Sequence, residues 1–155
     1  MKVGLYFGSF NPIHLGHLVI AQTLFQRGSL DQVWFVVSPQ NPFKKNKSLL
    51  HEFDRLTMVE KAISDNYKLK ASDIEFSMPK PSYTIDTLTK LSERHPNHEF
   101  KLIMGEDNLV QFDVPLTIDV ISPAVSVPGS GGQKMALQPK LAEGLPVLIV
   151  WFALY

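Results

Sequence analysis

The sequence predicts an α/β fold in which a parallel sheet carries helices on both faces. Residues 3–7 are an apolar run with β-branched and aromatic members, the composition of a buried strand. An apolar helical period begins near His14, and residues 32–37 are a second apolar run. Strand, helix and strand within about thirty residues indicate a βαβ unit, and hence a parallel pair of strands with a right-handed crossover.

The remaining elements follow from the same periodicities. We expect the first helix to end near Arg27 and Gly28. The residues that follow its helical period are Leu15, Leu18, Val19, Ala21, Gln22 and Phe25. Residues 53–63 predict a second helix. Residues 69–76 predict a strand in two pieces, and residues 99–104 predict a further core strand. A helix that begins just after Ser82 is predicted between them, with a buried face of Ile85, Leu88 and Leu91.

Length and charge limit the classes of function. The chain has 155 residues, a formal net charge of zero and no cysteine. We expect residues 1–155 to form one domain. Because a neutral chain has no overall field that attracts nucleic acid or an anionic membrane, we expect neither as a partner. The start of the chain lacks the pattern of a signal peptide, so we expect a cytoplasmic protein. The oligomeric state is not indicated.

The turn after the first strand has the features of a phosphate site. Gly8 leaves the backbone accessible to a ligand, and a helix start offers unpaired N–H groups. His14 and His17 share one face of the first helical turn, and Gly16 leaves space between them. Two imidazoles there can donate hydrogen bonds to a polyphosphate. The alternatives are a plain turn with solvated histidines, and a zinc site, for which a third ligand at suitable spacing is lacking.

Three strings resemble one enzyme family. Residues 8–17, Gly-Ser-Phe-Asn-Pro-Ile-His-Leu-Gly-His, resemble the signature of the HxGH nucleotidyltransferase superfamily. Residues 81–88, Pro-Ser-Tyr-Thr-Ile-Asp-Thr-Leu, resemble the segment with which bacterial nicotinate-nucleotide adenylyltransferases recognise the pyridine carboxylate. Residues 103–109 resemble that family's third nucleotide-site motif. The resemblance implies a Rossmann-like, HUP-like nucleotidyltransferase fold, with a nucleotide bound beyond the carboxyl ends of the strands.

The resemblance also implies an activity and a set of site residues. The implied reaction transfers the adenylyl group of ATP to nicotinate mononucleotide, giving deamido-NAD and pyrophosphate in NAD biosynthesis, with Mg²⁺ accompanying ATP. The implied catalytic residues are His14 and His17. The residues implied at ATP and its phosphates are Gly8, Ser9, Phe10, Gly16, Lys44, Gly105 and Asp107. The acceptor would be bound by Ser82, Tyr83 and Thr84, and no side chain is implied as a resident metal ligand. An arginine at the position of Arg55 is usual in the family's second helix, and we expect its role to be structural and not catalytic.

Two of these residues also have a simpler interpretation, in which they do not contact a substrate. Lys44 belongs to a loop with three lysines after the second strand, and a loop of that kind is often only solvated. Asp107 follows another strand end and is placed to accept hydrogen bonds from ribose hydroxyls or to bind magnesium through water. An aspartate that caps a short helix would have the same position in the sequence.

The segment from residue 110 to residue 155 is atypical. The resemblance ends near Phe112: the family's Trp and its Ser-x-Thr-x-Ile-Arg string are missing, and no Arg follows Arg94. Residues 128–133 resemble a flexible linker, so we expect partial disorder there. Residues 145–155 are almost wholly apolar, and they indicate either a final buried strand or translation of a shifted reading frame.

Because of the atypical segment, the sequence does not decide whether the chain is catalytically active. Without the expected Arg and helix start on the phosphates, we expect ATP to bind more weakly than in a full family member, with slow turnover or none. Two other functions remain possible. One is an adenylyl- or cytidylyltransferase with another phosphate acceptor, such as phosphopantetheine. The other is a nucleotide-binding protein without turnover.

Overall fold

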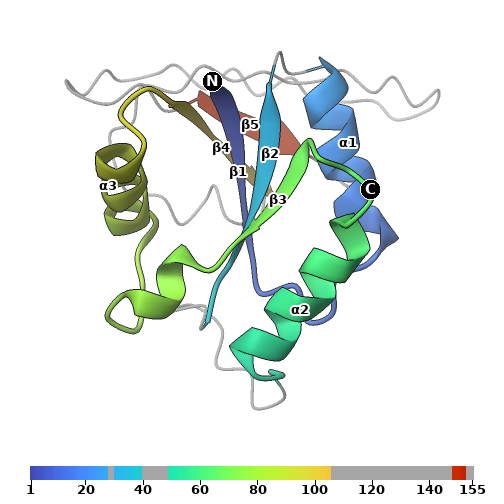
Figure 1. Ribbon diagram of the computed structural model, residues 1–155, viewed down its shortest axis with the longest axis vertical. Helices are drawn as coiled ribbons and strands as arrows, with labels where there is room; N and C mark the ends of the chain where they lie inside the picture. Colours follow the sequence, from blue (N-terminus) through green and yellow to red (C-terminus); the bar gives the residue numbers. More distant parts are fainter. Residues whose placement is uncertain (28–29, 40–48, 106–147, 153–155) are drawn as a thin grey trace, which may run out of the picture.

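The computed structural model describes residues 1–27, 30–39, 49–105 and 148–152 (Figure 1). Five strands form one sheet in the order β3-β2-β1-β4-β5, and every neighbouring pair is parallel. The elements in chain order are β1 (Lys2–Gly8), α1 (Leu15–Arg27), β2 (Gln32–Val37), α2 (Glu52–Ile63), β3 (Leu69–Ser72), the 3-10 helix η1 (Ile74–Ser77), α3 (Thr84–Arg94), β4 (Glu99–Gly105) and β5 (Leu148–Phe152). The predicted parallel α/β fold is confirmed.

The direction of winding reverses between β1 and β4. The chain moves from β1 through β2 to β3 on one side, and then returns to β4 on the other side of β1. The register places Leu5 between Trp34 of β2 and Leu102 of β4. In open parallel sheets, a ligand crevice forms beyond the carboxyl ends of the strands at such a reversal. Those ends point towards the lower half of Figure 1.

Helices cover both faces of the sheet. In Figure 1, α1 and α2 lie on one side of it and α3 on the other. One core cluster joins α1 and α2 to the sheet and includes Ala21, Leu24, Phe35 and Val59. A second cluster joins η1 and α3 to the opposite face and includes Leu5, Ile74, Leu88 and Leu102. The two apolar faces explain why the strands are nearly continuous apolar runs rather than alternating ones.

Two predicted helix faces are partly wrong. In α1, Leu15 is 74% exposed and Val19 is 54% exposed, whereas Ile20, Ala21 and Leu24 are buried. Apolar residues surround much of this helix, so its sequence does not single out one stripe. In α3, Leu88 and Leu91 are buried as predicted, but Ile85 is 43% exposed. A polar residue, Thr87, is fully buried there because it has a hydrogen-bonding partner beneath the helix.

Residues 69–76 do not form a strand in two pieces. Only Leu69–Ser72 pairs with β2, and Ile74–Ser77 is the 3-10 helix η1. The N–H of Phe76 donates to the carbonyl of Asp73 at 2.8 Å, which closes the tight turn. Ile74 remains buried against the sheet, so its apolar character reflects packing and not strand pairing.

The apolar end of the chain contains a strand. β5 pairs in parallel with β4, with Ile149 opposite Leu102, as the strand interpretation of residues 145–155 predicted. The linker-like residues 128–133 lie outside the described residues, and the shifted reading frame stays a prediction. Among the described helices, no segment combines the length and the apolar character that a bilayer crossing requires.

Candidate active site

The two predicted catalytic histidines lie together at the start of α1. Their ring centroids are 3.7 Å apart with an interplanar angle of 31°. The N–H of His17 donates to the carbonyl of His14 at 3.0 Å, which forms the turn that leads into α1. His14 is exposed and His17 is half-buried, so both rings are accessible at the edge where β1 ends. The predicted pairing on one face is therefore confirmed.

The tautomer of His17 follows from its surroundings. The backbone N–H of His14 donates to Nδ1 of His17 at 3.2 Å, so Nδ1 is an acceptor and the ring proton is on Nε2. Two effects lower the pKa of His17 from 6.5 to about 4: the larger is desolvation by burial, and the smaller is the charge of His14. At neutral pH, His17 is therefore an uncharged imidazole that presents an Nε2–H donor. It can therefore offer an anion a hydrogen-bond donor but no positive charge.

The side chain of Phe10 is buried beneath the loop between β1 and α1 and packs against residues on either side of it. It is 2% exposed, and its ring packs edge-on against His17 at 5.2 Å and Tyr6 at 5.6 Å. Its φ of 45° places it in the left-handed region, which non-glycine residues rarely adopt. The surrounding packing must therefore hold this conformation.

The two glycines of the loop have different functions. A Cβ on Gly16 would lie 3.0 Å from Cε1 of His14, so this glycine leaves room for that ring. The predicted open space between the two histidines is wrong, because their ring centroids are only 3.7 Å apart. Gly8 is the last residue of β1, and a Cβ there would lie 2.9 Å from the ring of Phe10. Access of a ligand to the backbone at Gly8 stays a prediction. The absence of a side chain at Gly8 therefore makes room for Phe10.

Arg55 joins this loop to the loop after β2. Its side chain is 0% exposed and donates to the carbonyls of Ser9, of Ser38 at 2.8 Å, of Pro39 at 3.0 Å and of Leu50 at 2.9 Å. Desolvation lowers the pKa of Arg55, but a guanidinium remains charged at neutral pH. Because four carbonyls from three segments converge on one planar cation, Arg55 fixes the backbone of Ser9. This is the structural role that the sequence predicted.

The predicted acceptor turn is the start of α3. Tyr83 is the N-cap and is 53% exposed, and its carbonyl accepts from the N–H groups of Asp86 and Thr87 at 3.1 Å each. Within the described part of the chain, the N–H groups of Thr84 and Ile85 have no acceptor. Helix starts of this kind favour anions. Ser82, however, is 8% exposed, and its hydroxyl donates to Glu75 at 3.0 Å.

The structure groups part of the predicted site and leaves part untested. The β1–α1 loop brings together Gly8, Ser9, Phe10, His14, Gly16 and His17. Gly105 is the last residue of β4, two positions beyond the pair Tyr6–Ile103, and so lies at the same edge of the sheet. Lys44 and Asp107 lie outside the described residues.

Sequence reasoning missed Glu75. This carboxylate is 2% exposed and accepts from the hydroxyls of Ser82 and Thr87. Its position between apolar residues gave no signal, since an isolated Glu in such a segment is usually exposed. Lys80 was also missed: its Nζ lies 2.6 Å from Oε1 of Glu52 and ties the loop before α3 to the start of α2.

The described residues do not form a metal cage of their own. Among them, no group of three or more His, Cys, Asp or Glu side chains is arranged to hold an ion. A magnesium ion that arrives with ATP needs no such cage, because it takes oxygen ligands from phosphates and water. The loop of His14 and His17, with imidazole donors and backbone amides, fits phosphates that carry their own cation.

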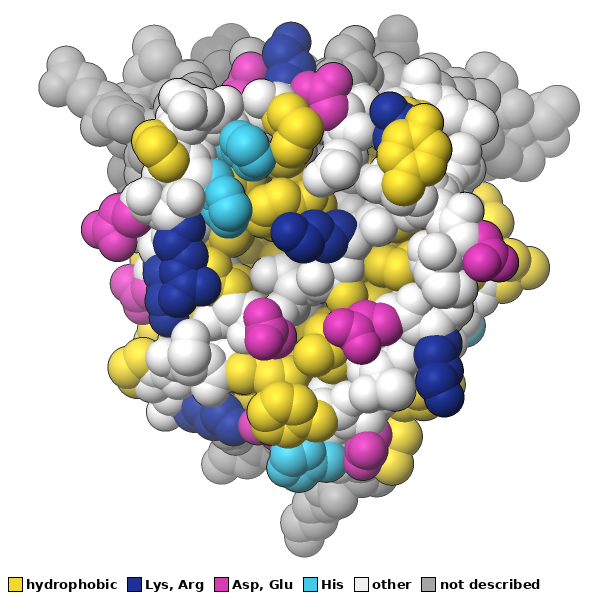
Figure 2. Space-filling model, viewed as in Figure 1, with side chains coloured by type: hydrophobic (Ala, Val, Ile, Leu, Met, Phe, Trp, Pro, Cys, Tyr) yellow, Lys and Arg dark blue, Asp and Glu magenta, His cyan; other side chains and the backbone are white. Residues whose placement is uncertain are grey.

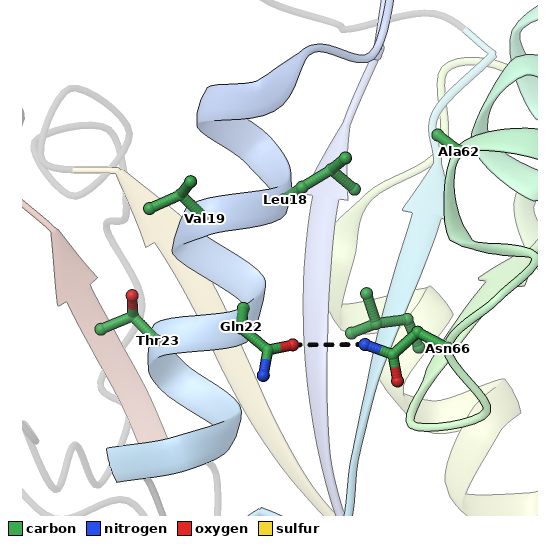
Figure 3. A pocket seen from close by; sticks show the side chains of 7 residues that line it. Leu18, Val19, Gln22, Thr23, Ala62 and Asn66 are labelled. Atoms are coloured by element: carbon green, nitrogen blue, oxygen red, sulfur yellow. Dashed lines mark hydrogen bonds between the residues drawn. The ribbon is translucent and has the colours of Figure 1, made fainter.

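A separate cavity of about 340 Å³ lies between α1 and α2 (Figure 3). Its lining is Leu18, Val19, Gln22, Thr23, Ala62, Asn66 and Leu69. A hydrogen bond of 3.2 Å from Asn66 Nδ2 to Gln22 Oε1 crosses it, as the dashed line in Figure 3 marks. No predicted site residue belongs to this lining, so the size of the cavity does not make it the reaction site.

On the face in Figure 2, positive and negative side chains are interspersed.

Residues 5–130 match the model of the cytidylyltransferase-like family. The chain belongs to this family. It is also 68% identical over 112 residues to a probable nicotinate-nucleotide adenylyltransferase of Cytophaga hutchinsonii, and 59% identical over 109 residues to one of Flavobacterium johnsoniae. These matches cover 72% and 70% of the chain, but only 58% and 56% of the relatives. The chain thus aligns with little more than half of each.

Two solved structures confirm the Rossmann-like fold. Plasmodium falciparum nicotinic acid mononucleotide adenylyltransferase complexed with NaAD is 26% identical, with a TM-score of 0.60 over 71% of this chain and 54% of that one. A putative nicotinate-nucleotide adenylyltransferase from Vibrio parahaemolyticus is 25% identical, with a TM-score of 0.59 over 72% and 64%. Both agree with the family resemblance of the sequence motifs.

Proposed function

We propose that this chain transfers the adenylyl group of ATP to nicotinate mononucleotide. The observation that carries the proposal is the pair His14 and His17 at the edge of the sheet, held by Phe10 and by the Arg55-fixed backbone of Ser9. The relative of 68% identity, named a probable nicotinate-nucleotide adenylyltransferase, supports this choice of acceptor.

The proposed reaction is an in-line displacement. A phosphate oxygen of the mononucleotide attacks the α-phosphorus of ATP, and the bond from that phosphorus to the bridging oxygen breaks. Pyrophosphate leaves with the bond's electron pair, and deamido-NAD forms. No covalent intermediate with the protein is needed. The rate enhancement therefore comes from alignment of the two substrates and from stabilisation of the charge that develops on the phosphates. Bound magnesium would neutralise phosphate charge.

Each part of the candidate site has a proposed role in this step. The Nε2–H of His17, His14 and the N–H groups of Ser9 and Phe10 bind the triphosphate and stabilise charge on the leaving pyrophosphate. Gly105, Lys44 and Asp107 are proposed to contact the nucleotide. At the start of α3, the free N–H groups and the exposed Tyr83 would receive the nicotinate carboxylate.

The test is an assay of pyrophosphate release from ATP with three acceptors. Nicotinate mononucleotide should give the highest rate, above nicotinamide mononucleotide and phosphopantetheine, because amide donors at a helix start suit a carboxylate better than a carboxamide. Release of adenylylated product should match pyrophosphate release mole for mole. Equal rates with the acid and the amide would contradict the proposed acceptor.

A second candidate function is nucleotide binding without turnover. It is favoured by the sequence after Phe112, where no Arg occurs. The matched relatives also cover only 72% and 70% of the chain. Calorimetric titration with ATP on the same preparation distinguishes the two. Heat of binding without pyrophosphate release supports the second candidate, and turnover removes it.

A further inference from the structure

The 3-10 helix η1 carries a carboxylate that is buried without a cation. Glu75 is 2% exposed, and both of its oxygens accept from hydroxyl groups. Oε2 accepts from Ser82 at 3.0 Å and Oε1 accepts from Thr87 at 2.8 Å. Among the described residues, no Lys, Arg or His forms an ion pair with it. The two hydroxyls are therefore its side-chain partners.

The two partners of Glu75 lie on either side of the turn at the start of α3. Ser82 precedes Tyr83, the N-cap, and Thr87 lies one helical turn later. The hydroxyl of Thr87 also lies 3.2 Å from the carbonyl of Tyr83, the same carbonyl that accepts from the N–H groups of Asp86 and Thr87. Both oxygens of one buried group thus hold the two ends of this turn.

Stability alone does not explain a carboxylate at this position. Burying a charged group costs free energy that hydroxyl donors offset only in part. Replacing such polar groups with well-packed apolar residues is often neutral or stabilising. An apolar residue lacks the two directional hydrogen bonds with which a carboxylate constrains the orientation of the turn.

We propose that Glu75 is the positioning residue of the acceptor turn. It acts through Ser82 and Thr87, and it keeps the N–H groups of Thr84 and Ile85 in one orientation for a carboxylate-bearing acceptor. This inference rests on the proposed function and deepens it. It also revises the role of Ser82, whose hydroxyl is already donated to Glu75 and which therefore supports the turn instead of binding the acceptor directly.

The experiment compares Glu75→Gln and Thr87→Val with a matched control, Thr89→Val. Thr89 is on the same helix, is exposed, and donates to the carbonyl of Ile85 at 2.9 Å, away from Glu75. Glu75→Gln keeps the size of the side chain and one acceptor oxygen, so it should remain folded, as thermal melting will show.

Three quantities are measured for each variant: the affinity for nicotinate mononucleotide, the affinity for ATP, and the hydrogen exchange of the N–H groups of Asp86 and Thr87. In Glu75→Gln and Thr87→Val, the affinity for the mononucleotide should fall about tenfold, the effect of one lost hydrogen bond. ATP affinity should stay within twofold, and exchange at Asp86 and Thr87 should accelerate. Thr89→Val should change none of these.

The outcomes separate this inference from the proposed function. Equal losses for ATP and the mononucleotide, or unchanged exchange in a folded Glu75→Gln variant, would overturn the role of Glu75. If the parent chain binds no mononucleotide, the proposed function fails. Faster exchange at Asp86 and Thr87 in Glu75→Gln would still support positioning of the turn, and unchanged exchange would still refute it.

Discussion

The molecule contains two histidine pairs with the same spacing and opposite surroundings. His14 and His17 stack at 3.7 Å, and His95 and His98 stack at 5.1 Å. In both pairs, the N–H of the second histidine donates to the carbonyl of the first at 3.0 Å. The local turn is therefore alike, and in each pair it brings the two rings close to one another.

The position of each pair in the fold determines what it can do. His14 and His17 lead into α1 at the edge where β1 ends, whereas His95 and His98 connect the end of α3 to the start of β4. The second pair packs against Trp34, with centroid distances of 5.2 Å and 6.1 Å. Nδ1 of His98 is buried and has no partner in the described part of the chain. The first pair can meet a ligand beside a helix start, and the second packs on the core.

The largest expected difference between the pairs is in catalysis. His17→Ala should lower the rate of adenylyl transfer about a hundredfold or more, because it removes a donor to the developing charge. His98→Ala should leave the rate within about twofold. Steady-state pyrophosphate release measures both, and thermal melting verifies that each variant is folded. If the rate of the His17→Ala variant were close to that of the parent, this histidine would have no part in the mechanism. If the parent does not turn over, ATP affinity replaces the rate as the measurement.

The residue between the histidines provides a second contrast. Gly16→Ala places a methyl group 3.0 Å from Cε1 of His14 and should displace that ring, lowering ATP affinity about tenfold, the effect of one lost charge-assisted hydrogen bond. The equivalent position in the other pair is the exposed Asn97, whose backbone carbonyl accepts from the N-terminus. Asn97→Ala keeps that contact and should not change ATP affinity. Calorimetric titration compares the ATP affinities of the two variants. Similar losses of affinity in both would contradict a specific role for the Gly16 position.

Acidification should affect stability through His17. Its pKa is about 4 in the folded state and about 6.5 when unfolded, so protonation favours unfolding. The contribution of neutral His17 is fully present above about pH 6.5 and is lost as the pH falls towards about 4. Melting temperature measured from pH 7 to pH 4 should fall less in His17→Asn than in the parent. NMR titration of the His17 ring should show no midpoint between pH 5 and pH 8.

The smallest expected effect is a spectroscopic change at the second pair. Burial, then the charges of His98, Lys70 and Arg94, lower the pKa of His95 below its usual value. His95 should therefore acquire charge only below about pH 6.5, the unperturbed value. Because its ring lies 5.2 Å from that of Trp34, protonation should alter the indole emission. The pH-dependent change should vanish in His95→Asn and in Trp34→Phe. A midpoint above the usual value would contradict the packing described for this pair.

The sequence by itself determined the features that depend on neighbouring residues. The apolar runs of β1 and β2 and the helical period between them predicted the parallel unit, because strand and helix periodicities are local. The loop of His14, Gly16 and His17 was predicted from its own residues and from the family resemblance. The structure then confirmed the close approach of the two rings. The end of β2 at Val37 matched the prediction because the apolar run gives way there to Ser38 and Pro39.

Only the tertiary structure decided how the site is supported. Arg55 donates to the carbonyl of Ser9, which is 46 positions earlier, and Glu75 accepts from Thr87, which is 12 positions later. The rotation of α1, which exposes Leu15 and buries Ile20, was decided in the same way. Propensity and periodicity describe a residue's neighbours in the chain. These contacts instead depend on which face of each element packs against the sheet, and that is the choice that buries the most apolar surface over the whole molecule.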